Sequence, residues 1–231
     1  LPEGARVTRF APSPTGYLHL GGLFGALADK MTAKVSDGVA YLRIEDTDKK
    51  REIGDGVSAV TSGLSAFGVD FDEGVSGFET ENGIYGPYTQ SKRAEIYQTI
   101  AKSLVIKGLA YPCFCTEDDL KAMHEQQEAA KENYGYYGKY AIWRDRPIED
   151  IEAELKKGTE WVLRFRSEGD PSRYFKVKDA IRGEISMPEN IQDVVILKKN
   201  DLPTYHFAHV VDDHFMRTGI VVRGEEWMAS L

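Results

Sequence analysis

The chain has 231 residues, of which 42% are hydrophobic and 29% charged, enough for one large or two modest domains with a packed core. Its net charge of −8 argues against nonspecific nucleic-acid binding through bulk charge, while a local basic groove stays compatible with that charge. There is no apolar run of membrane-helix length, no signal-peptide pattern, and Cys113 and Cys115 lie only one residue apart. We therefore expect a cytoplasmic protein without a structural disulfide.

Strand-like and helix-like patterns alternate over the first hundred residues. Apolar runs indicate strands at 7–10 and 40–44, and apolar residues at helical spacing indicate helices over 23–31, 57–67 and 96–104. Gly108 is placed as a C-terminal cap of the third helix. Such alternation implies crossover connections and a parallel sheet, so we predict an α/β, Rossmann-like nucleotide-binding fold.

The pattern changes after about residue 110. Strands are indicated at 111–115, 161–166 and within 174–187, and short helices follow Thr116 and precede Gly158. Buried-strand patterns return in "DVVILKK" from Asp193 and in "GIVVRGEEW" at 219–227. We therefore predict a first catalytic half at 1–110, an α+β insertion at 111–190, and the start of a second catalytic half at 191–231.

The segment "RFAPSPTGYLHLGG" at 9–22 joins the first strand to the first helix. Glycines at such a junction let a ligand approach the backbone, and the helix start offers unpaired N–H groups and a partial positive charge. Pro12 and Pro14 stiffen the loop before a ligand arrives, and His19 can donate to a phosphate oxygen. Taken alone, the glycines also fit an ordinary turn with a surface histidine.

Five ordered motifs carry a family resemblance. They are His19-Leu-Gly-Gly22, "RIEDTD" at 43–48, "YGPYTQSKR" at 85–93, "LPTYHFAHVVDDHFM" at 202–216 and "VVRGEEW" at 221–227. The first resembles the "HIGH" signature of class I aminoacyl-tRNA synthetases, and the set is similar to their bacterial glutamyl form over nearly the whole chain.

The resemblance implies a pocket for glutamate. Arg9 and Arg223 would face its side-chain carboxylate, Ser13 and Glu45 would hold its amino end, and Tyr205 would help to close the pocket. His209 is also placed there, at a position where some relatives carry another polar residue. The cluster of Glu45, Asp46 and Asp48 is by itself equally compatible with a magnesium site or a solvated turn. His206 is expected to pack or to support the residues that touch the substrate, and Asp212 and Asp213 to cap or orient the following segment.

The resemblance further implies ATP-dependent activation of glutamate and its transfer to the 3′ adenosine of tRNA(Glu), with Mg²⁺ accompanying ATP. The catalytic loop would comprise Thr15, His19, Gly21 and Gly22. The ATP-binding residues would be Ala11, Pro12, Gly16, His19, Gly21, Glu226 and Trp227. Positioning and charge neutralisation would supply most of the catalysis.

The insertion is expected to hold the tRNA acceptor end, through Lys139, Arg144, Arg164 and Arg166. Some relatives bind zinc through a Cys-x-Cys pair and two later ligands. Here Cys113 and Cys115 supply the first half, whereas Tyr140 and Ile142 stand at the later positions. We therefore expect no metal at this degenerate half-site.

No lysine-rich "KMSKS"-like loop follows Trp227, so we expect a fragment of a longer, monomeric enzyme, lacking the anticodon-binding domains and nearly inactive by itself. Three alternatives stay open. They are a shorter paralogue that glutamylates a modified base of tRNA(Asp), a small-molecule nucleotidyltransferase that shares the histidine–glycine loop, and a catalytically dead RNA-binding paralogue.

Overall fold

The computed structural model describes residues 1–47, 54–77 and 79–230. The chain packs as two compact units, the first formed by Leu1–Tyr97 with Tyr205–Leu231 and the second by Gln98–Thr204. The chain therefore leaves the first unit and returns to it after one long excursion. The sequence predicts a division of the chain at residues 110 and 190 into two catalytic segments and an insertion that holds tRNA. That functional division stays a prediction.

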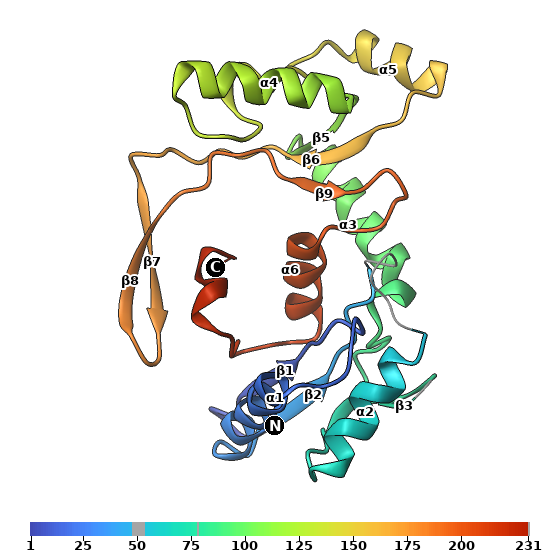
Figure 1. Ribbon diagram of the computed structural model, residues 1–231, viewed down its shortest axis with the longest axis vertical. Coiled ribbons are helices and arrows are strands. Elements are labelled where there is room, and N and C mark those ends of the chain that lie inside the picture. Colours follow the sequence, from blue (N-terminus) through green and yellow to red (C-terminus); the bar gives the residue numbers. More distant parts are fainter. Residues whose placement is uncertain (48–53, 78, 231) are drawn as a thin grey trace. The chain divides into compact units, whose positions relative to one another are not determined.

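The first unit contains a four-stranded sheet in the order β1-β2-β3-β4. Strands β1 (Val7–Phe10), β2 (Val39–Leu42) and β3 (Glu73–Gly77) are parallel, and β4 (Thr80–Asn82) pairs antiparallel with β3. The helices α1 (Leu20–Lys34) and α2 (Gly56–Ala66) connect the parallel strands, as Figure 1 shows. The predicted α/β fold with a parallel sheet is thus confirmed.

The rest of the first unit comes from two segments of the chain. The 3-10 turn η1 (Gln90–Arg93) leads into α3 (Ala94–Ile106), of which only the first turn, up to Tyr97, belongs to this unit. The chain returns through α6 (Tyr205–Phe215) to the turn η3 (Glu225–Ser230). The strand expected within "GIVVRGEEW" is absent from the described structure. Only the amides of Gly219 and Ile220 donate to the Val7 carbonyl, so the segment runs beside β1 without forming a ladder.

The second unit is an α+β body, as predicted for the insertion. Strands β5 (Ala110–Cys113), β6 (Val162–Phe165) and β9 (Val195–Leu197) form an antiparallel sheet, and β7 (Tyr174–Asp179) pairs with β8 (Gly183–Pro188) as a hairpin. Its helical elements are α4 (Glu117–Ala130), η2 (Gly138–Tyr140) and α5 (Ile148–Lys157).

The expected helix ends in this unit are present. Thr116 and Asp119 form the predicted capping box of α4, and Gly158 ends α5 with a φ of +73°. Strand β9, which the sequence placed after the insertion, pairs with β6 and therefore belongs to the second unit.

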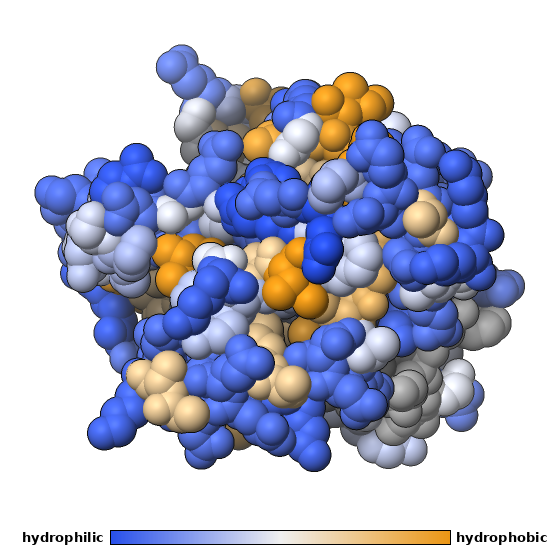
Figure 2. All heavy atoms as spheres, turned by 90° about the horizontal axis from the view of Figure 1, so that it is seen from above, coloured by the Kyte–Doolittle hydropathy of each residue, from blue (hydrophilic) through white to orange (hydrophobic). Residues whose placement is uncertain are grey.

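Each unit buries its own apolar core. The first packs α1 and α2 on the sheet through Ala26, Leu42, Ile44, Val60 and Leu64. The second is aromatic, with Tyr111, Met123, Tyr136 and Tyr140. The face drawn in Figure 2 is mostly hydrophilic with a few separate hydrophobic patches, consistent with a charged fraction of 29%. Among the described residues, no helix is long and apolar enough to cross a bilayer.

Candidate active site

The loop after β1 ends in a helix entrance shaped by His19. His19 is the N-cap of α1, and its Nδ1 accepts a hydrogen bond of 3.2 Å from the amide of Gly22. Because Nδ1 is the acceptor, the ring proton lies on Nε2, which is left as a donor. A Cβ on Gly21 would come within 3.1 Å of the His19 ring, so glycine there lets the ring take this position.

Backbone contacts fix the same loop from two sides. The Glu45 amide donates to the Pro12 carbonyl at 3.0 Å, which joins the loop to the residues that follow β2. On the other side, a Cβ on Gly56 would lie only 2.3 Å from the Pro14 carbonyl oxygen, so α2 can approach the loop only with glycine. Ser13 lies between these contacts and Thr15 follows the second one; both are exposed, as a ligand-binding loop requires.

Arg9 and Arg223 meet at His209. Arg9 is 4% exposed, and its Nη2 lies 2.8 Å from His209 Nε2. The Nη2 of Arg223 makes a short contact with the same imidazole nitrogen. Residues 9 and 223, far apart in the chain, therefore converge through α6, as the glutamate-pocket hypothesis requires.

Two carboxylates complete this cluster. Glu45 Oε1 lies 2.9 Å from Arg43 Nη2 and 3.5 Å from His209 Nδ1, while Asp213 Oδ1 accepts from Arg43 at 2.7 Å and from Arg9 at 3.3 Å. Burial opposes the charge on Glu45, but its contacts with His209 and Arg43 outweigh burial and lower its pKa. The pKa of Asp213 is lowered against burial in the same way, so both groups are anions at neutral pH.

An aromatic wall lies beside the cluster. The Tyr205 ring stacks on His209 at a centroid distance of 5.5 Å and contacts the Trp227 ring at 5.5 Å, with an interplanar angle of 37°. Both rings are partly exposed, at 36% for Tyr205 and 43% for Trp227. Glu226 is exposed beside Trp227, and His206 is exposed and edge-on to Tyr205. The wall thus joins the predicted glutamate residues to the predicted adenosine residues.

Sequence reasoning missed Arg43 and the separate roles of Asp212 and Asp213. Arg43 is fully buried, and Asp212 accepts from Gln90, Arg93 and Tyr97 at 2.7–3.0 Å. The available signal was a charged residue inside the apolar run at 40–44, because a buried charge needs a partner.

Asp46 binds the amide and hydroxyl of Ser91. Asp48, the third member of the possible magnesium cluster, lies outside the described residues.

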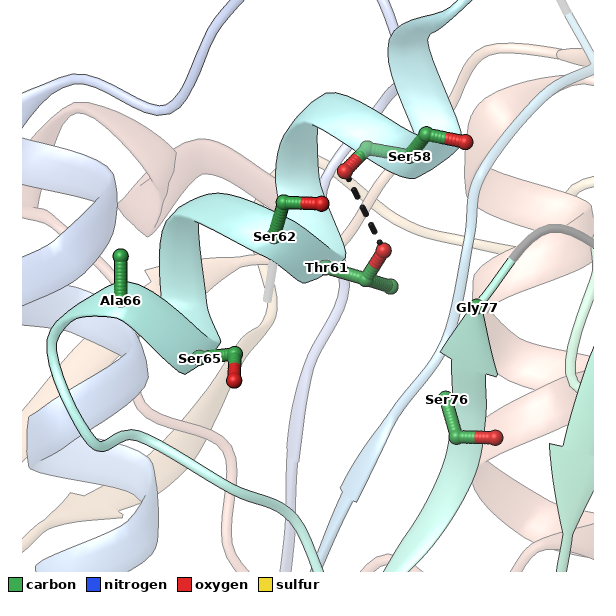
Figure 3. A pocket seen from close by; sticks show the side chains of 7 residues that line it. All are labelled: Ser58, Thr61, Ser62, Ser65, Ala66, Ser76 and Gly77. Carbon is green, nitrogen blue, oxygen red and sulfur yellow. Dashed lines mark hydrogen bonds between the residues drawn. The ribbon is translucent and has the colours of Figure 1, made fainter.

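A separate pocket on the first unit has different chemistry. It lies between α2 and β3, and Figure 3 shows its lining residues Ser58, Thr61, Ser62, Ser65, Ala66, Ser76 and Gly77. These seven residues offer hydroxyl groups and no charge. Among the described residues, its lining therefore offers neither the cations nor the general acid or base that phosphate or carboxylate chemistry uses.

The basic residues expected to contact tRNA mostly have partners within the second unit. Arg164 is 7% exposed, donates to the Asp193 carbonyl at 2.8 Å and lies over the Tyr136 ring. Arg144 pairs with the Asp193 carboxylate at 2.5 Å, and Arg166 with Asp145 at 2.7 Å. Lys139 keeps 66% of its side chain exposed while it contacts Glu132. Arg164 therefore has a structural position, and Lys139 is the most accessible of the four.

Cys113 and Cys115 share one neighbour. Both sulfur atoms lie 3.5 Å from the Tyr136 hydroxyl, which also accepts from the Trp143 amide at 3.0 Å. The described residues contain no group of three or more His, Cys, Asp or Glu side chains placed to hold a metal. The donor set at the cysteines is therefore two thiols and a phenol, short of the four N or S ligands of an ordinary structural zinc site. The expectation that no metal binds there stays a prediction.

A parallel sheet whose first strand leads into a glycine-lined helix start is typical of nucleotide-binding α/β proteins. Residues 6–231 match the family described as tRNA synthetases class I (E and Q), catalytic domain. The chain belongs to this family.

Named relatives agree with this assignment. The chain is 54% identical over its full length to the glutamate–tRNA ligase of Acetivibrio thermocellus and 53% identical to that of Clostridium beijerinckii, and it covers 42% of each protein. A crystal structure of a glutamate tRNA ligase from Elizabethkingia meningosepticum in complex with its amino acid matches with a TM-score of 0.87. That match has 36% identity and covers 98% of this chain and 45% of the other. The chain thus spans less than half the length of these relatives.

Proposed function

We propose that this chain is the catalytic part of a glutamate–tRNA ligase, which activates L-glutamate with ATP and transfers it to the 3′ adenosine of tRNA(Glu). The observation that carries the proposal is the convergence of Arg9, Arg223 and Glu45 on His209. The names of the relatives support the same substrate.

Glutamate fits this cluster by charge. Two guanidinium groups suit the planar carboxylate of its side chain, and the Glu45 anion, with Ser13 close by in the loop, suits its ammonium group. Glutamine has the same shape without the side-chain charge, so it would leave the two guanidinium groups without a counter-ion. A mismatch of this kind in a buried site discriminates strongly between substrates.

ATP would lie along the loop and the aromatic wall. The amides at the start of α1 and the Nε2–H of His19 face a phosphate favourably, with about 0.3–2 kcal/mol from the helix dipole. Tyr205 and Trp227 offer aromatic surface beside the glutamate cluster, and the Gly21 backbone allows a flat base to approach. Mg²⁺ would arrive with ATP and neutralise phosphate charge. The α-carboxylate of glutamate would attack the α-phosphate of ATP with release of pyrophosphate, and the tRNA hydroxyl would then take the acyl group with release of AMP.

We place the tRNA acceptor end on the second unit. Lys139, Arg144 and Arg166 are the candidate contacts, with Lys139 the most exposed. Arg164 is excluded from this set because it is buried under Tyr136 and Asp193. The cytoplasmic location and monomeric state expected from the sequence stay expectations. No observation described above favours any of the three alternative functions.

The test is ATP–pyrophosphate exchange with tRNA(Glu) present, measured on the longest polypeptide that contains this chain. Exchange is expected with glutamate and not with glutamine. Arg223→Gln is expected to lower kcat/KM for glutamate by about 10²-fold or more, because truncating one partner of a buried charge contact costs about 2–5 kcal/mol. Lys178→Gln, on the hairpin of the second unit, is the matched control and should leave the rate unchanged. Equal exchange with glutamine, or exchange without any amino acid, would overturn the proposal.

A further inference from the structure

His209 lies in a set of contacts that no single neutral form of the ring can satisfy. Its Nε2 faces the Nη2 donors of Arg9 and Arg223 and also the Asp213 Oδ2 acceptor at 3.0 Å. Its Nδ1 faces the Arg43 Nη2 donor at 3.2 Å and the Glu45 Oε1 acceptor at 3.5 Å. Each ring nitrogen is thus placed between cationic donors and an anionic acceptor.

A neutral imidazole has one acceptor nitrogen and one N–H donor. With Nε2 as acceptor, the ring satisfies Arg9 or Arg223 and its Nδ1–H meets Glu45, but that proton points toward Arg43. With Nδ1 as acceptor, Arg43 is satisfied and the Nε2–H meets Asp213, but it opposes both other arginines. The doubly protonated ring satisfies both carboxylates and opposes all three arginines.

The charges around the ring are unbalanced without a ligand. The titratable and charged groups that face it are Arg9 from β1, Arg43 and Glu45 from the end of β2, Tyr205, His206 and Asp213 from α6, and Arg223. Three guanidinium cations and two carboxylates thus face the ring. The cations that face the ring therefore exceed the carboxylates by one charge.

We propose that His209 is a specificity-determining residue, which occupies the donors of Arg9 and Arg223 until the substrate side-chain carboxylate displaces it and then takes up a proton. The inference rests on the proposed function. A bound carboxylate offers two oxygen atoms to two guanidinium groups that otherwise compete for one nitrogen lone pair. It also brings the count of carboxylates to three, equal to the cations, so the released ring can be protonated and donate to Asp213 and Glu45.

The same coupling acts against glutamine. A side-chain amide brings no negative charge, so it does not offset the third guanidinium group and does not favour protonation of the ring. Its NH₂ group would also face donors instead of acceptors. Glutamine binding should therefore proceed without proton uptake, and the difference between the two substrates should widen as the pH falls.

The experiment is calorimetric titration of the chain with L-glutamate at pH 6 and pH 8, in two buffers of different ionisation enthalpy. Because a histidine titrates in this range, we expect glutamate to bind at least about 5-fold more tightly at pH 6 and to take up protons at pH 8. His209→Gln should abolish both effects. His214→Gln, on the exposed face of the same helix, should retain them.

The possible outcomes separate the inference from the function on which it rests. Proton uptake that disappears in His209→Gln supports the inference. Glutamate binding without proton uptake in the unmodified chain overturns it while the proposed function stands, and this arm needs no variant to fold. Proton uptake that persists in His209→Gln also overturns it. Absence of glutamate binding at either pH overturns both.

Discussion

At the scale of single residues, the adjacent carboxylates of α6 have different tasks. Asp212 points to η1 and α3, where it accepts from Arg93 at 2.7 Å, and it is fully buried. Asp213 points to the candidate site, where it accepts from Arg43 and Arg9. Neighbouring helix positions differ by about 100° in direction, so one aspartate pair connects the site to its supporting structure.

Asp29 gives a prediction about pH and stability. It is 2% exposed on α1, and its Oδ1 has no hydrogen-bond partner among the described residues. Burial raises its pKa from 3.8 to about 8, while the charge of Arg9 opposes that rise. The folded state therefore holds a proton that the unfolded state has lost between about pH 4 and pH 8, so stability falls as the pH rises through that window.

The measurement is urea unfolding of the chain at pH 5, 6, 7 and 8. We expect this group to contribute a loss of up to about 1.4 kcal/mol per pH unit, and Asp29→Asn to remove that contribution. Asp118→Asn, on the exposed surface of α4, should leave the slope unchanged. A slope that persists unaltered in Asp29→Asn would show that the carboxyl is ionised in the folded chain.

At the scale of elements, propensity and periodicity were sufficient wherever an apolar face decides the structure. Helix α1 and the capping box of α4 were predicted from residue types alone. Strands β3 and β4 were missed because their sequences, "EGVSG" and "TEN", each hold a single β-branched residue among residues that are depleted in strands. Strand β3 forms because it pairs with β2, and this contact between distant parts of the chain is not visible in the local sequence.

Some residues of the candidate site were likewise predicted from the sequence, and others were not. Arg9, Arg223 and Glu45 were predicted through family motifs, and the structure brings them together at His209. Arg43 was missed, and Asp213 was expected only to cap or orient the following segment, because the need for a buried counter-charge is visible in the sequence while its partner is not. Residue 43 and residue 213 become neighbours only after the whole first unit has folded.

The contact between the loop and α2 gives a prediction in which two effects have opposite signs. Helix propensity favours Gly56→Ala by up to about 1 kcal/mol. A Cβ there would lie 2.3 Å from the Pro14 carbonyl oxygen, and overpacking typically costs about 1–3 kcal/mol. The backbone of Pro14 cannot rotate away like a side chain, so we expect a net loss of stability and weaker nucleotide binding.

Gly54→Ala is the matched control, because a Cβ at Gly54 would meet no atom within 4 Å. Urea unfolding and titration with an ATP analogue should show little change for this variant. If Gly56→Ala proves as stable as Gly54→Ala and binds the nucleotide equally well, the approach of α2 does not fix the loop.

At the scale of the whole molecule, each unit contains a buried aspartate that accepts several hydrogen bonds, which we call its hub. In the first unit Asp212 accepts from Gln90, Arg93 and Tyr97. In the second unit Asp193 accepts from Tyr111 and Arg144, and from the Ser167 amide at 2.8 Å. Both aspartates are fully buried, and each connects segments that are far apart in the sequence. The cooperative structure of each unit should therefore depend on its own hub.

This gives a prediction about how stability is distributed. Removing one partner of a buried ion pair typically costs about 3–5 kcal/mol, because the other charge is left without a counter-ion. Asp193→Ala should therefore destabilise Gln98–Thr204, and Asp212→Ala should destabilise Leu1–Tyr97 with Tyr205–Leu231. Native-state hydrogen exchange resolved by peptide is the measurement, because it reports local opening as well as global unfolding. Loss of protection confined to the altered unit is expected for each variant. Equal loss in both units from either substitution would mean that the chain unfolds as one cooperative body, and the two hubs would then stabilise a single structure.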